Sequence, residues 1–205
     1  MNNYSSFFRR ILVASVSAVL LVIPSVSKAQ VAFGLHGTIA SPSIDGAKTR
    51  GGAGANLKVF LSPNVAVGVA AKYISLSYDA YEIGTSKIQS VGSLIPLTGS
   101  LDFYLASGAL RPYVGVEAGA YIHRYDLRYN GDNLYNTSNT RAGATPKLGL
   151  TFSAGNFGIF AEGNYHFIFS NKNGSANVGS FGNISYDNPD KLWGINVGVI
   201  FGLPN

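Results

Sequence analysis

Few side chains in this sequence are spaced for catalysis. It contains three histidines, His36, His123 and His166, and no cysteine. A hydrolytic site needs a nucleophilic hydroxyl or thiol beside a histidine, and the spacing identifies no such pair. Glu162 and His166 are four residues apart, which in an extended strand is too far for direct contact. The sequence therefore predicts no catalytic residues and no enzyme.

The sequence also lacks motifs for binding metal ions or phosphate groups. The metal-binding spacing His-x-x-x-His is absent. The glycine-rich segment 51–54 lacks the Lys-Ser or Lys-Thr of a phosphate-binding loop. Without cysteine there is no disulfide framework and no lipoprotein attachment. We therefore expect no metal site and no cofactor.

The first 29 residues are typical of a secretory signal peptide. Arg9 and Arg10 precede the apolar run 11–23, and small residues follow where a signal peptidase would cleave. An uncleaved helical anchor is the alternative, but the run is shorter than the roughly 20 residues that a transmembrane helix needs. We expect a signal peptide at 1–29, export across the inner membrane, and one mature domain at 30–205.

The composition favours a membrane protein built from strands. The signal contains three of the 15 basic residues and none of the 10 acidic ones, so 12 basic residues remain against 10 acidic. This balance gives no reason to expect nucleic acid as a partner. Charged residues make up 12% of the chain, against about 25% in a soluble domain. No second apolar run could form a spanning helix, which leaves a membrane β-barrel.

Alternation of apolar with small or polar residues predicts eight strands. They are expected at 31–40, 51–61, 65–77, 91–105, 111–127, 143–154, 157–169 and 191–203. The short connections are 62–64, 106–110 and 155–156, and the long polar ones are about 41–50, 78–90, 128–142 and 170–190. Short turns alternating with long loops are typical of outer-membrane barrels. The predicted fold class is all-β, an eight-stranded antiparallel up-and-down transmembrane β-barrel.

The last predicted strand has one unbroken apolar face, which runs from Trp193 through Phe201 to Leu203. Trp193 and Phe201 stand near its two ends, where aromatic rings meet a membrane–water interface. The spacing of Asn196, Gly198, Phe201 and Leu203 resembles the C-terminal assembly signal of outer-membrane β-barrels. Many such proteins end on the aromatic residue, whereas this chain continues beyond it.

The opposite face of the predicted strands is small or polar, with about one charge per strand. A soluble lipocalin-type barrel would also alternate, but its exterior would carry many Lys and Glu, so we place the polar face inside. The predicted lumen network is Lys58, Lys72, Asp102, Glu117, Lys147 and Glu162, together with the three histidines. Lys147 is expected to pair with Glu117 and Glu162, because its strand lies between theirs. We interpret this network as a plug, with a gated pore as the alternative, because eight strands leave no open channel.

A family resemblance supports this interpretation. The segment Arg111-Pro112-Tyr113-Val114-Gly115-Val116-Glu117-Ala118-Gly119, which opens a strand after a tight turn, resembles the small eight-stranded outer-membrane β-barrel family of Gram-negative bacteria. That family includes the membrane domain of outer-membrane protein A, the X-type barrels, opacity-like adhesins and porin-like barrels of Bacteroidetes.

The resemblance implies a place in the cell outer membrane, with outer-membrane lipid and the barrel assembly machinery as partners. It also implies a structural or surface-interaction protein, whose outer loops at 128–142 and 170–190 contact an extracellular ligand. A narrow porin-like channel for small solutes is the alternative, because the family includes both kinds of protein.

Overall fold

The computed structural model describes residues 30–43, 49–76, 78–83, 86–129, 132–169, 174–177, 183–186 and 191–204. The predicted signal peptide at 1–29 lies outside the described residues. The strands are β1 (Gln30–Pro42), β2 (Arg50–Ser62), β3 (Val65–Ser75), β4 (Tyr78–Ile83), β5 (Ser86–Tyr104), β6 (Leu110–Tyr129), β7 (Asp132–Ala154), β8 (Phe157–Ile168), β9 (Gly174–Asn177), β10 (Asn183–Tyr186) and β11 (Lys191–Phe201). Among the described residues, no helix has the length and apolar character needed to cross a membrane.

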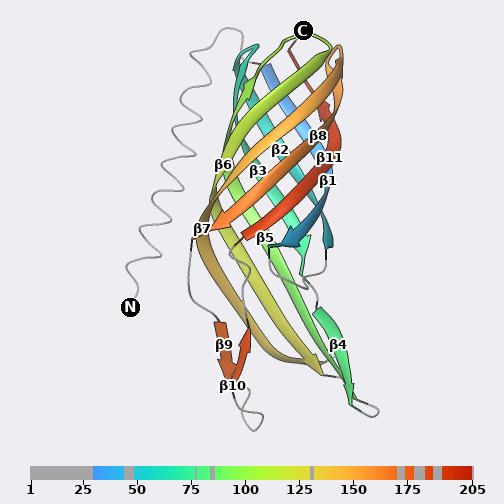
Figure 1. The fold of residues 1–205 in the computed structure, drawn as a ribbon, viewed down its shortest axis with the longest axis vertical. Coiled ribbons are helices and arrows are strands. Elements are labelled where there is room, and N and C mark those ends of the chain that lie inside the picture. The colour runs from blue at the N-terminus through green and yellow to red at the C-terminus, as the bar shows by residue number, and fades with distance from the viewer. Residues whose placement is uncertain are drawn as a thin grey trace.

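Eight of these strands close into a barrel (Figure 1). Antiparallel neighbours follow in the order β1, β2, β3, β5, β6, β7, β8 and β11. The ring closes where β1 pairs with β11, from Phe33 opposite Phe201 to Pro42 opposite Leu192. Closure pairs the strand edges, as the hydrocarbon core of a membrane requires. The predicted eight-stranded antiparallel barrel is confirmed.

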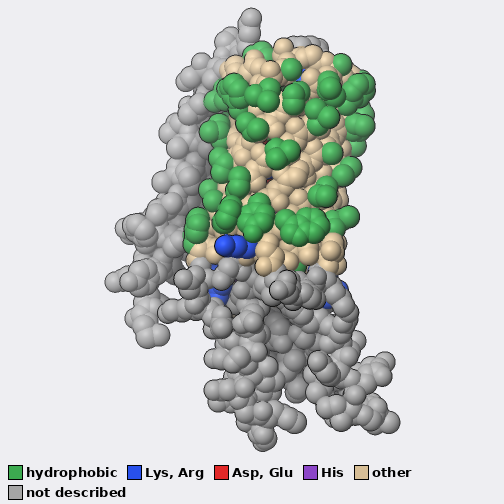
Figure 2. All heavy atoms as spheres, in the orientation of Figure 1, with side chains coloured by type: hydrophobic (Ala, Val, Ile, Leu, Met, Phe, Trp, Pro, Cys, Tyr) green, Lys and Arg blue, Asp and Glu red, His purple; other side chains and the backbone are tan. Residues whose placement is uncertain are grey.

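The outer face of the barrel is a belt of large apolar side chains (Figure 2). In β8, exposed and buried residues alternate over most of the strand, and β11 follows the same rule. Leu148 and Val197 on this face are 68% and 61% exposed. So large an apolar surface would promote aggregation in water, whereas lipid solvates it. The apolar alternation in the sequence therefore specifies a transmembrane barrel.

Aromatic residues lie on the outer face at both ends of the belt. Trp193 lies opposite Tyr165 on β8, and Phe201 lies between Phe33 and Phe157 at the other end. The rings of Phe157 and Phe201 are 5.3 Å apart. Rings at such positions are the usual anchors at the two surfaces of a membrane.

The short connections gather at one end of the barrel, here called the turn end; the opposite end is the loop end (Figure 1). In the turn between β2 and β3, the hydroxyl of Ser62 accepts hydrogen bonds from the backbone N–H groups of Asn64 and Val65, at 3.3 and 3.1 Å. In the turn between β7 and β8, Gly155 has φ of 62°, a left-handed conformation that glycine adopts without strain. The three predicted turns lie at this end.

Three of the four predicted long loops contain strands, so the loop prediction was wrong there. β6 and β7 stay paired out to Tyr129 opposite Asp132, so most of 128–142 belongs to β7, which forms a two-stranded ribbon with the outer part of β6. β4 pairs with an extension of β5 across 78–90, and β9 pairs with β10 within 170–190. Outside a membrane both faces of a strand meet water, so no apolar alternation marks these segments. Strands β4 to β7 therefore project beyond the barrel at the loop end (Figure 1).

Candidate functional site

The inward face of the barrel brings the six predicted charged residues together. Each comes from a different strand, and these six strands are consecutive around the ring. They are Lys58 on β2, Lys72 on β3, Asp102 on β5, Glu117 on β6, Lys147 on β7 and Glu162 on β8. All six side chains are buried. The three positive and three negative groups of this network therefore balance one another in charge.

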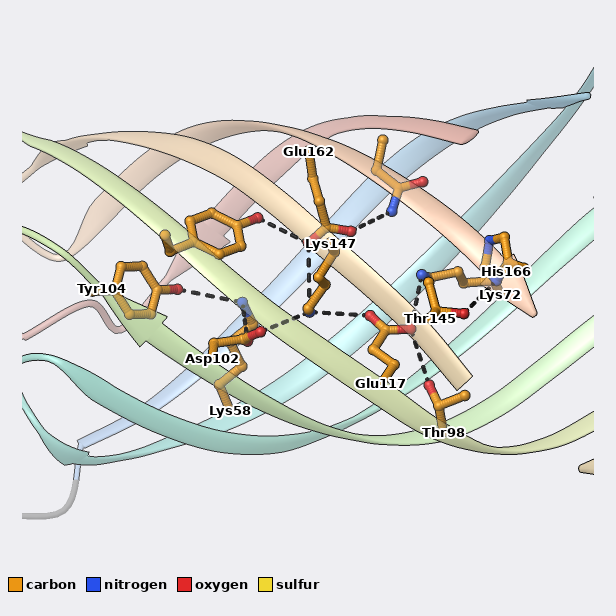
Figure 3. Close-up of polar contacts among 12 residues, drawn as sticks. Lys58, Lys72, Thr98, Asp102, Tyr104, Glu117, Thr145, Lys147, Glu162 and His166 are labelled. Atoms are coloured by element: carbon orange, nitrogen blue, oxygen red, sulfur yellow. Dashed lines mark hydrogen bonds and ion pairs between the residues drawn. The ribbon is translucent and has the colours of Figure 1, made fainter. Parts of the chain in front are cut away.

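Lys147 lies at the centre of this network (Figure 3). Its Nζ is 2.9 Å from Asp102 Oδ1, 3.1 Å from Glu117 Oε1 and 3.4 Å from Glu162 Oε2. Two further ion pairs complete the group, Lys58 with Asp102 at 2.8 Å and Lys72 with Glu117 at 2.9 Å. Each carboxylate thus has at least one ammonium partner, which is the condition for keeping charges buried.

Neutral side chains also donate hydrogen bonds to two of these carboxylates. Tyr113 donates its hydroxyl hydrogen to Glu162 at 2.9 Å, and the Asn196 amide donates to the same carboxylate at 2.8 Å. Thr98 donates to Glu117 at 3.2 Å. These bonds hold the carboxylates in fixed positions around Lys147, because a charged acceptor binds its donors strongly. Asn196, predicted only as part of an assembly signal, therefore also belongs to the network.

A glycine on β6 makes room for the central ion pairs. Gly115 is paired with Asp102 on one side and Lys147 on the other. A Cβ at Gly115 would lie 2.2 Å from Asp102 Oδ1 and 3.0 Å from Lys147 Cε. Any larger residue would push the carboxylate and the ammonium group apart.

Apolar clusters lie on both sides of the charged network along the barrel axis. The turn-end cluster consists of Ala32, Phe60, Ala66, Tyr104, Tyr113, Phe160, Ile200 and Leu203. The loop-end cluster consists of Ala40, Ile74, Leu76, Leu94, Tyr121, Ile168 and Leu192. The charges therefore lie between two layers of buried apolar groups, where their attraction is stronger than in water.

The chain end differs from the sequence prediction, which placed Leu203 on the lipid-facing side. β11 ends at Phe201, and Gly202 has φ of 85°. This left-handed residue breaks the alternation and turns Leu203 into the turn-end cluster, where it is fully buried. The prediction that Leu203 faces lipid was wrong, because alternation holds only while the chain stays extended.

Arg111 holds the chain end in place, a role that the sequence did not reveal. Its Nη2 donates to the backbone oxygen of Pro204 at 2.5 Å, and its Nε donates to the oxygen of Gly108 at 2.9 Å. The backbone N–H groups of Gly202 and Leu203 both donate to the oxygen of Asn156. The last residues are thus bound to two different turns at the mouth of the barrel.

The three histidines are buried on the inner face, and they lie apart from one another in the register. Thr145 Oγ1 is 2.7 Å from His166 Nδ1, and the hydroxyl of Tyr121 contacts both side chains. This hydroxyl–imidazole pair could not be identified from the sequence, because its members are 21 residues apart on different strands. Thr145 and His166 are almost fully buried, so no substrate reaches them in this conformation. Among the described residues, no cluster of side chains could hold a metal ion.

A second set of polar side chains lies on the part of the wall formed by β2, β1, β11 and β8. It consists of Asn56, His36, Asn196 and Asn164, and we call it the neutral row. Six of its nitrogen and oxygen atoms have no hydrogen-bond partner among the described residues: Asn56 Oδ1, His36 Nδ1 and Nε2, Asn196 Oδ1, and Asn164 Oδ1 and Nδ2. A buried polar atom without a partner costs about 1–3 kcal/mol. Six such atoms would cost about as much as the entire stability of a domain, roughly 5–15 kcal/mol.

An antiparallel ring of eight strands with a lipid-facing exterior and an ion-paired interior is a transmembrane β-barrel. Solved structures support this class. The crystal structure of Neisserial surface protein A matches with a TM-score of 0.51 and 12% identity, over 85% of this chain and 96% of that one. OprG, an outer membrane protein of Pseudomonas aeruginosa, matches at 0.52 and 15%, over 84% and 94%. Ail, the attachment invasion locus protein of Yersinia pestis, matches at 0.50 and 15%, over 84% and 96%.

No protein family matches the sequence, and no curated protein matches it. Since the structural matches share little sequence, they establish the fold rather than the activity. The chain has the fold of the small eight-stranded outer-membrane β-barrels.

Proposed function

We propose that this chain is an exported outer-membrane protein whose closed barrel anchors a projecting sheet for contacts at the cell surface, and that it is not an enzyme. The observation that supports a lumen closed to ions is the neutral network of six buried charges between two apolar clusters. An ion crossing the lumen would have to separate these pairs and then pass two apolar layers. Eight-stranded barrels in general have an interior just wide enough for side chains.

Planar-bilayer recording tests the closed barrel. We expect the purified, folded protein to give no openings above the baseline, because the side chains of the network fill its path. Faster gel migration of the unboiled sample would verify that the protein is folded, since a barrel whose strand edges are all paired resists unfolding by detergent. Stable single-channel openings from such a sample would contradict the proposal and support a narrow channel for small solutes.

The narrow channel is retained as the alternative because of the neutral row. Asn56, His36, Asn196 and Asn164 form an uncharged polar strip along one side of the interior. Uncharged polar groups are suited to small solutes, which need hydrogen bonds but no charge partner. The same bilayer recording separates this function from a closed barrel.

The surface role is supported by the sheet that extends beyond the barrel. From Asp132 to Arg141, β7 pairs with β6, while its pairing with β8 begins only at Gly143 opposite Ile168. Within the described residues, the outer part of β7 therefore has a strand edge without a partner, and such an edge can accept an added strand from another chain. Connections on a rigid scaffold are also the usual place for recognition.

Shortening the ribbon tests the surface role. Replacing residues 125–137 with Asn-Gly should join Arg124 to Ser138, an existing cross-strand pair, through a favoured hairpin turn. We expect cells with this variant to lose attachment to immobilised extracellular proteins or glycans that the parent binds, while the amount of folded barrel is unchanged. Equal attachment by parent and variant would count against the ribbon as the contact surface.

Assembly is proposed to depend on the end of β11, through contacts of Asn196, Gly198, Phe201 and Leu203 with the barrel assembly machinery. We expect Phe201→Ala, or deletion of residues 199–205, to lower the amount of folded protein in the outer membrane. The Phe201 ring lies on the outer face, 48% exposed, so its removal leaves the interior packing unchanged. Refolding into detergent without the machinery provides the control, and Phe201→Ala should refold there. Unchanged membrane levels of both variants would argue against the signal.

A further inference from the structure

We propose that the neutral row binds a cluster of ordered water molecules inside the closed barrel. His36, Asn164 and Asn196 are each more than nine-tenths buried. Their unpaired atoms face the barrel interior, because all three residues occupy inward positions of β1, β8 and β11. A buried polar atom that no protein group satisfies is the usual partner of an internal water molecule.

The four side chains are neighbours, so one set of water molecules can serve them all. Asn56 lies opposite Gly34, two residues from His36. His36 in turn lies opposite Gly198, two residues from Asn196. Asn196 lies opposite Glu162, two residues from Asn164 on the same face. Each member is thus a diagonal neighbour of the next, a distance that a bridging water spans.

Glycines let three of these side chains lie flat against the wall. A Cβ added to Gly34 would lie 2.7 Å from Asn56 Oδ1, and a Cβ added to Gly54 would lie 2.5 Å from His36 Nε2. A Cβ added to Gly194 would lie 2.6 Å from Asn164 Oδ1. The polar atoms of these three side chains are therefore held beside the wall of the barrel.

The chemistry of the row favours water over an ion. The unpaired atoms include amide oxygens, an amide nitrogen and imidazole nitrogens, which together offer both donors and acceptors. The adjacent network of three lysines and three carboxylates is already balanced, so a bound ion would leave a net charge buried. A water molecule donates and accepts without adding charge, and it typically makes two to four hydrogen bonds.

Nuclear magnetic resonance of the full folded protein in detergent micelles tests this inference, which rests on the closed-barrel part of the proposed function. We expect cross-relaxation peaks between water and the side-chain amide protons of Asn164. The methyl protons of Ile200, in the turn-end apolar cluster, should show none. Absence of the Asn164 peaks would overturn the proposal.

The sign of a stability change provides a second test. If the Asn164 amide were buried without partners, Asn164→Leu would raise the urea midpoint, because it removes unsatisfied groups. If water binds there, the same change strips the water of its partners, and we expect a lower midpoint. The variant Asn164→Ser, which keeps a polar group and leaves space for another water, should lie closer to the parent. A raised midpoint in Asn164→Leu would overturn the proposal.

Bilayer conductance separates failure of this inference from failure of the proposed function. Water peaks at Asn164 in a protein without channel openings support both. Water peaks in a protein that also gives channel openings would support water binding at the neutral row and contradict the closed barrel. No water peaks and no openings would overturn the row and leave the closed barrel intact.

Discussion

Replacing Lys147 with alanine is expected to lower the free energy of unfolding by about 3–5 kcal/mol, the typical cost of removing one partner of a buried ion pair. Among the described residues, Lys147 is the one cation that contacts Asp102, Glu117 and Glu162 together. Its loss leaves two lysines against three carboxylates in the buried network. Urea unfolding in detergent micelles would measure the change, and bilayer recording would show whether the loosened interior also begins to conduct.

The structure predicts which second change restores stability. Without Lys147, Asp102 keeps Lys58 and Glu117 keeps Lys72, so Glu162 is the carboxylate left without a described cationic partner. Glu162→Gln should therefore recover more of the loss than Glu117→Gln in the Lys147→Ala background. Lys191→Ala is the matched control, because Lys191 is exposed at the start of β11. A Lys147→Ala protein as stable as its parent would contradict the proposed network.

Replacing Leu203 with alanine should cost about 2–5 kcal/mol, the range for removing a buried leucine and leaving a cavity. Leu203 is fully buried in the turn-end cluster, and its Cδ1 lies 2.8 Å from where a Cβ on Gly158 would be. The strands around it are held by ladder hydrogen bonds, so they cannot collapse into the space. Urea unfolding of protein refolded in detergent would measure this loss without involving the assembly machinery.

Leu148→Ala is the matched control for this prediction. Leu148 lies on the outer face and is 68% exposed, so detergent fills the space left by its side chain. We expect a smaller loss of stability than for Leu203→Ala. If the two variants lose equal stability, Leu203 does not pack inside the barrel as the structure describes.

Most of the barrel could be predicted from the sequence, because lipid outside and packed side chains inside impose opposite chemistry on alternate residues. That rule correctly placed Glu117, Lys147 and Glu162 on the inner face, on neighbouring strands. The alternation rule fails where a strand does not lie between lipid on one side and the packed interior on the other. The outer parts of β6 and β7 extend beyond the barrel, so the alternation between lipid and packed interior does not mark them as strands.

The remaining features depend on contacts between distant residues. Leu203 continued the apolar alternation by type, and only the left-handed φ of Gly202 directs it inward. Arg111 was identified as part of a strand-opening motif, but its bond to Pro204 joins residues 93 positions apart. The Thr145–His166 pair depends on which strands are adjacent and in which register, and the two residues are too far apart in sequence to suggest it.

The inward turn at Gly202 has a practical consequence for handling the protein. Pro204 is buried, and its backbone oxygen is bound by Arg111, so residues 202–204 are packed into the mouth of the barrel. An affinity tag attached there would compete with Leu203 and Pro204 for their contacts. Gln30 is exposed at the same end, which makes a position directly before Gln30 better suited to a purification tag or a fluorescent label.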